Sequence, residues 1–60
     1  MIVIHPKVYE ECKRLADEWG IPEDPPGTRG WRIYMAYHEA YYRAVRGKPS
    51  NPPMWERSST

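Results

Sequence analysis

The first clear pattern along the chain is a one-sided apolar stripe in residues 6–19. Apolar side chains recur there at intervals of three and four residues and cover about 120° of a helical wheel, while the opposite side is charged. Pro6 suits the first turn of a helix, and Gly20 followed by Pro22 is a typical stop signal. The pattern predicts an amphipathic helix from Pro6 to Trp19 with its charged side in solvent.

A second and wider stripe lies in residues 28–46. Thr28 is a suitable N-cap, and Gly47 after Arg46 predicts the C-terminal end of a helix. The polar side chains occupy only roughly 60° of the wheel, and the apolar and tyrosine positions cover about 200°. The polar positions are Arg32, Glu39, Arg43 and Arg46, and the centre of the apolar face comprises Trp31, Tyr34, Met35, His38, Tyr41, Tyr42 and Val45.

The remaining segments are not predicted to be helical. MIVI at residues 1–4 is a short strand or an extended arm, and three prolines and two glycines make residues 21–30 a connector. The fold class predicted is mainly α: a two-helix hairpin with this N-terminal strand or arm and an irregular, Pro-rich C-terminal tail. Residues 1–47 form a single small domain, and residues 48–60 are extended or partly disordered.

The aromatic face of the second helix is wider than the first helix can cover. A face of about 100° is enough to pack on one core, so the excess must meet another segment or another chain. Tyr, Trp and Arg are also the residue types enriched at interface hot spots. We therefore expect a protein partner or a second copy of the chain, and the predicted contact residues are Trp31, Tyr34, Tyr37, Tyr41, Arg43 and Trp55. Trp55 either serves as such a contact or packs back on the body with Met54.

Composition supports one small domain held by aromatic packing. Sixty residues permit a single core, and Cys12 is the only cysteine, so no internal disulfide can form. Three Trp and five Tyr supply the packing area instead. No stretch approaches the roughly 20 apolar residues of a membrane span, and MIVI is too short for a signal-peptide core. We expect a soluble, cytoplasmic protein with no membrane partner.

The charge is nearly balanced overall but not along the chain. The net charge is +1; residues 1–27 hold three bases and six acids (−3), and residues 28–60 hold six bases and two acids (+4). The basic second half could face an acidic partner. Arg29, Arg32 and Arg46 are the candidate contacts for an anion or nucleic acid, an interaction that the near-neutral charge makes the less favoured one.

No catalytic or metal-binding motif is complete. His38-Glu39 resembles the start of the HExxH zinc motif, but Tyr42 stands where the second histidine would be. Cys12 lies on the apolar face of the first helix, as a structural thiol would. Neighbouring carboxylates such as Glu10 and Glu11 point in different directions on a helix and do not converge as a general acid/base pair. We predict no enzymatic activity, no cofactor and no metal.

An N-terminal strand, a proline, a helix reading VYEECKRLADEWGI and a second helix resemble the ribbon-helix-helix repressors and antitoxins. The resemblance covers residues 1–46 and is strongest over 3–21. It implies a homodimer whose paired strands enter the DNA major groove while the helices form the dimer core. Two features differ from the family: MIVI is wholly apolar where the family reads bases with polar side chains, and the connector is longer and richer in proline.

These observations lead to one functional prediction with one alternative. The prediction is a small non-enzymatic protein-binding module, an adaptor or inhibitor of a larger complex, that uses the Tyr/Trp/Arg surface of the second helix. The more specific suggestion of a phage-type inhibitor comes from what small stand-alone proteins often do, and no residue of this chain points to it. The alternative is a ribbon-helix-helix-like homodimer that binds DNA as a transcriptional regulator or antitoxin.

Overall fold

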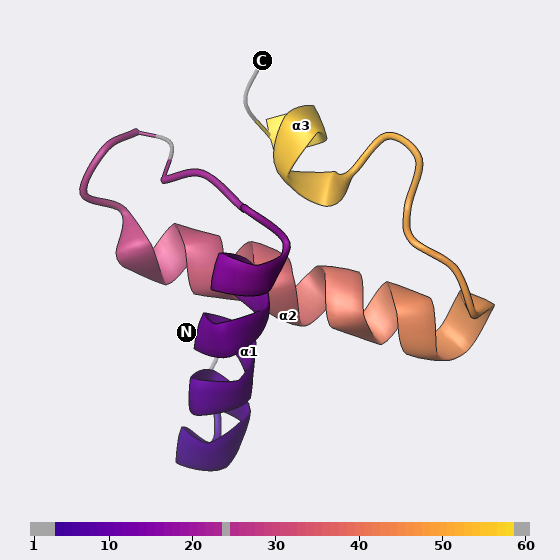
Figure 1. Cartoon of the computed structure of the whole chain (residues 1–60), viewed down its shortest axis with the longest axis horizontal. Coiled ribbons are helices and arrows are strands. Elements are labelled where there is room, and N and C mark those ends of the chain that lie inside the picture. The colour runs from indigo at the N-terminus through magenta and orange to yellow at the C-terminus, as the bar shows by residue number, and fades with distance from the viewer. Residues whose placement is uncertain (1–3, 24, 59–60) are drawn as a thin grey trace.

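The protein consists of two long helices that pack on each other and a short third helix (Figure 1). The computed structural model describes residues 4–23 and 25–58. Helix α1 spans Pro6–Glu18, α2 spans Arg29–Arg46 and α3 spans Met54–Ser58. The predicted mainly helical hairpin is confirmed, and the described residues contain no strand. The predicted N-terminal strand falls almost entirely on residues 1–3, outside the described residues.

Helix α1 has a cap at each end. The His5 ring Nδ1 accepts a hydrogen bond of 3.2 Å from the Lys7 backbone N–H, and Pro6 occupies the first turn. At the other end Gly20 adopts φ 66°, and the Ile21 N–H donates to the Ala16 carbonyl at 3.0 Å. This backbone pattern is a Schellman motif, which satisfies carbonyls that the last turn leaves without partners. It also turns Ile21 into the core, where only 1% of the residue is exposed.

Helix α2 begins and ends where the sequence predicts. Thr28 holds the N-cap position, but its hydroxyl donates to the Pro25 carbonyl in the connector and makes no bond to the helix. At the C-terminus Gly47 has a left-handed φ of 74°, and its N–H donates to the Arg43 carbonyl at 2.6 Å. Left-handed backbone geometry disfavours every residue with a Cβ, so a glycine is needed at this position.

We expect Gly47→Ala to lower the free energy of unfolding by about 1 kcal/mol. The cost comes from backbone strain alone, since a Cβ at Gly47 would meet no atom within 4 Å. Gly30→Ala is the matched control: that site is equally open but lies in the first turn of α2 without a positive φ. It should be neutral or slightly stabilising. Urea denaturation followed by circular dichroism measures both, and equal effects would contradict the assignment of Gly47.

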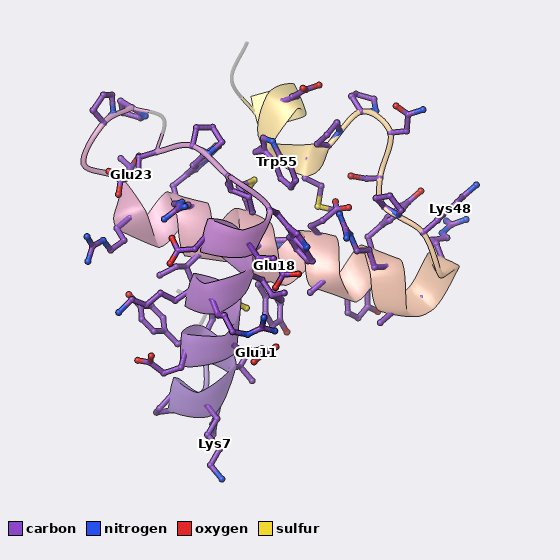
Figure 2. All side chains as sticks on the ribbon, viewed as in Figure 1. Lys7, Glu11, Glu18, Glu23, Lys48 and Trp55 are labelled. Atoms are coloured by element: carbon purple, nitrogen blue, oxygen red, sulfur yellow. The ribbon has the colours of Figure 1, made fainter. Side chains whose placement is uncertain are left out.

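The core lies where α1 crosses α2, and the C-terminal segment closes it (Figure 1). Figure 2 shows Trp55 on α3 directed toward the two long helices. Within the tail, residues 54–58 form a short helix, and Trp55 packs back on the body. The buried core residues are Cys12, Ala16, Ile21, Ile33, Met35 and Ala36, and Leu15, Trp19, Trp31, Tyr34, Met54 and Trp55 pack around them.

The rotation of α2 about its own axis differs from the prediction. Its most buried residues are Ile33, Ala36 and Glu39, whereas Tyr41 and Val45 are 66% and 63% exposed. Glu39 of the narrow polar side thus faces inward, and the part of the aromatic side that holds Tyr41 and Val45 faces outward. Two features allow this: Ala36 and Ala16 are both 0% exposed and small enough for close helix contact, and the inward polar side chains find partners inside the chain.

Candidate interaction surface

The outward side of α2 carries a row of large uncharged side chains. Tyr37, Tyr41 and Val45 follow one another at intervals of four residues, so they lie along one line of the helix. They are 37%, 66% and 63% exposed. Beside them lies the half-buried His38. The centroid of its ring is 4.3 Å from that of the Tyr34 ring and 5.8 Å from that of the Tyr37 ring, and both pairs of rings meet edge-on. We call Tyr34, Tyr37, His38, Tyr41 and Val45 the aromatic face.

Two apolar residues of α1 are also exposed. Val8 and Tyr9, at 37% and 38%, are one turn N-terminal to the buried Cys12 and continue its side of the helix. The Cys12 thiol is buried and free, as predicted, and burial raises its pKa, with the charge of Glu11 adding to the effect. A raised pKa leaves less of the nucleophilic thiolate, so Cys12 serves as a packing residue.

His38 and Glu39, the pair that resembles half of a zinc motif, project in different directions. His38 belongs to the aromatic face, as predicted. Glu39, one of the polar positions of the wheel, is 0% exposed, and its carboxylate lies 3.2 Å from the Arg43 Nε. In the described part of the chain no group of three or more His, Cys, Asp or Glu side chains is placed to hold a metal ion.

Glu39 is the centre of a buried polar cluster that holds the C-terminal segment. Its carboxylate accepts hydrogen bonds from the Ser50 backbone N–H at 2.8 Å, from the Ser50 hydroxyl and from the Arg43 Nε. Burial alone would raise the pKa of Glu39, but the bonds from Ser50 and the charge of Arg43 outweigh it and hold that pKa below its usual value. The sequence gives no sign of this cluster, because Ser50 is eleven residues from Glu39 in a segment predicted to be irregular.

Arg43, a predicted partner contact, has contacts inside the protein. Its Nε bonds Glu39, and its guanidinium lies over the Trp19 ring, 4.0 Å from the centroid. It therefore joins α1, α2 and the C-terminal segment through Glu39. Trp31, Tyr34 and Trp55 pack against the core. Of the predicted contact residues, the structure places Tyr37 and Tyr41 in the open and gives the other four partly internal positions.

Arg32, a predicted anion contact, closes the C-terminal end of α1. Its guanidinium donates to the carbonyls of Ile21 and Ala16, the latter at 3.0 Å, and to the Asp17 carboxylate at 2.8 Å. Three of its five N–H donors are thus engaged within the chain. A guanidinium supplies several donors in one plane, which is why arginine suits this position.

The other two candidate arginines lie at opposite ends of α2. Arg29 is the first helical residue and lies 3.9 Å from Glu23; Arg46 is the last and lies over the Tyr42 ring, 5.8 Å from the centroid. A helix of this length separates its ends by about 25 Å. The predicted set of Arg29, Arg32 and Arg46 is therefore not brought together into one anion site.

A recess that the sequence does not reveal lies at the C-terminal end of α2. It forms because the chain turns back after Gly47, and Ser50 bonds the buried Glu39. The recess is lined by Tyr42, Lys48, Pro49, Ser50, Asn51 and Pro53. Arg46 lies over the ring of Tyr42, the aromatic residue of the lining, 5.8 Å from the centroid. The recess thus combines one ring and two prolines with the base Lys48, and a second base, Arg46, lies near the ring.

Comparison with known proteins gives no relative from which a function can be transferred: no family model, no curated protein and no solved structure matches this chain. Within the described ranges, none of the helices combines the length and the apolar character that crossing a membrane requires.

Proposed function

We propose that this protein is a non-enzymatic binding module that docks a protein partner on the aromatic face of α2. The observation that supports the proposal most directly is the rotation of α2. The helix satisfies its own core with Ile33, Ala36 and Glu39 and leaves Tyr37, Tyr41 and Val45 outside.

The chemistry of this face suits protein recognition. Its side chains are large and mostly aromatic, and tyrosine buries much area while its hydroxyl group keeps a polar contact. Their spacing of i, i+3, i+4, i+7 and i+11 matches the anchors with which helices dock against other helices or into grooves. No charged residue belongs to the face, and interface cores are likewise depleted of charge.

The proposal is tested by photo-cross-linking in lysate of the source cells. A photoreactive phenylalanine derivative replaces Tyr41 in one preparation and the exposed Glu10 of α1 in another. We expect Tyr41 to give a discrete cross-linked protein, identified by mass spectrometry, that Glu10 does not give.

The cross-linked partner is then purified and its affinity measured by calorimetry. Tyr37→Ala and Tyr41→Ala should each weaken binding by about 1–2 kcal/mol, the range of interface tyrosines. The matched control is Tyr9→Ala on α1, an exposed tyrosine outside the aromatic face. Affinity that is unchanged by both α2 substitutions would exclude this face as the docking site.

A further inference from the structure

The recess beside Tyr42 and the bases around it define what the partner should carry. We propose that the recess binds an acidic, amphipathic segment of the partner protein, with an apolar side chain against Tyr42 and carboxylates toward Arg46 and Lys48. This inference rests on the proposed function, because the same helix presents the aromatic face. It adds to the proposed function the charge of the partner's segment and the position of its contact on this protein.

The first step is the distribution of ion pairs. Five carboxylates of the described residues are paired with arginines inside the chain: Glu11, Asp17, Glu18, Glu23 and Glu39. Arg46 and Lys48 form no ion pair with any described residue, and both are exposed. Arg46 and Lys48 therefore make this end of α2 positive, since none of the ion pairs among the described residues neutralises them.

The second step is the shape and chemistry of the recess. Tyr42, Pro49 and Pro53 offer apolar surface, and Asn51 supplies a polar side chain at the edge. Glu39, which bonds the lining residue Ser50, is 0% exposed and has its oxygens bonded to Ser50 and Arg43. An apolar anchor flanked by carboxylates complements this arrangement, and a basic segment would be repelled.

Two other occupants fit less well. A nucleic acid needs several phosphate contacts for useful affinity. Among the described residues, Arg46 and Lys48 are the bases of this site that form no ion pair, since Arg32 and Arg43 are bonded inside the chain. Among the described residues of a second copy the five paired carboxylates are occupied, Glu10 stands between Lys7 and Lys13 on α1, and Glu56 of α3 has an interaction within its own chain.

The test uses three labelled helical peptides with the same leucine-rich apolar side. The remaining positions carry glutamate, glutamine or lysine, and binding to the full chain is followed by fluorescence anisotropy. We expect the glutamate peptide to bind about five- to tenfold more tightly than the glutamine peptide at low salt. The difference in affinity between the two peptides should shrink as the salt concentration rises from about 0.05 to 0.5 M, because Arg46 and Lys48 are exposed and salt screens their charges.

Charge reversal locates the site. Arg46→Glu with Lys48→Glu should remove the preference for the glutamate peptide and favour the lysine peptide. Lys7→Glu with Lys13→Glu changes the net charge equally on α1 and should leave the preference nearly intact. If circular dichroism shows that the charge-reversed variant does not fold, the neutral variant Arg46→Gln with Lys48→Gln replaces it in this experiment. In NMR spectra, the glutamate peptide should shift the amide signals of Lys48 and Asn51.

Each unfavourable result has a definite meaning. Equal affinity for the glutamate and glutamine peptides, or no binding of the glutamate peptide at low-millimolar concentration, would overturn the inference. So would displacement of the peptide by a DNA duplex at lower concentration, which would favour nucleic acid. If both peptides bind equally and Tyr37→Ala with Tyr41→Ala abolishes that binding, the aromatic face stands and only the acidic specificity fails.

Discussion

Glu39→Ala is expected to lower the free energy of unfolding by about 2–4 kcal/mol. The substitution removes three hydrogen bonds to a charged acceptor and leaves the Ser50 N–H and hydroxyl buried without their partner. A domain of this size is stabilised by only about 3–5 kcal/mol, so the variant should be largely unfolded at 37 °C. Urea denaturation at pH 7, followed by circular dichroism, gives the difference.

Glu10→Ala is the control for this prediction, because Glu10 is also a helical glutamate but is exposed. It should change the free energy of unfolding by less than about 0.5 kcal/mol. The loss of stability in Glu39→Ala should be accompanied by a loss of order in the C-terminal segment. Faster hydrogen exchange of the Ser50 amide would show it. A stable Glu39→Ala variant with a protected Ser50 amide would contradict the cluster.

The same cluster makes stability depend on pH in a defined direction. The folded state holds the pKa of Glu39 below the ordinary value of 4.5, so the carboxylate stabilises the fold above that value. This contribution disappears as the pH falls through the lower, folded-state pKa. The pKa of Glu11 is lowered too, by its hydrogen bond to Arg14 and the charge of Arg14, but that group is fully exposed and screened by salt. At high salt, Glu39→Gln should therefore flatten the acid limb of the stability curve more than Glu11→Gln.

The helices were predictable because their ends depend on local chemistry. Pro6, Gly20 and Gly47 act on the backbone of their immediate neighbours, and each helix starts or stops within one or two residues of the predicted position. The exposure of Tyr37 and Tyr41 was also foreseeable, since α1 could not cover a face of 200°. Local patterns contain this information because it concerns residues close together in the chain.

The inward rotation of α2 was not predictable in the same way. A helical wheel assigns a glutamate to the outside, and it cannot show that Ser50, eleven residues later, donates to Glu39 twice. Nor can it show that Arg32 reaches the carbonyls at the end of α1. Glu39 and Arg32 on the narrow side of α2 thus have partners that lie far away in the sequence. The buried alanines complete the contact because their small size lets the helices approach.

Ile33→Ala and Val45→Ala form a matched pair that measures this rotation directly. Both replace a β-branched residue of α2 by alanine, but Ile33 is 1% exposed in the core and Val45 is 63% exposed. Ile33→Ala should cost about 2–4 kcal/mol through lost burial and the cavity that remains. Val45→Ala should change stability by less than about 0.5 kcal/mol, because solvent already surrounds the side chain and alanine favours the helix.

The sequence pattern alone predicts a different result, which makes the pair decisive. The wheel puts Val45 in the centre of the apolar face and Ile33 on its flank, so a helix packed by its aromatic side would lose more stability at Val45. Urea denaturation of both variants distinguishes the two rotations, and a larger loss at Val45 would show that the aromatic face is the core. The opposite order would leave Tyr37, Tyr41 and Val45 free in the folded monomer, as a docking face must be.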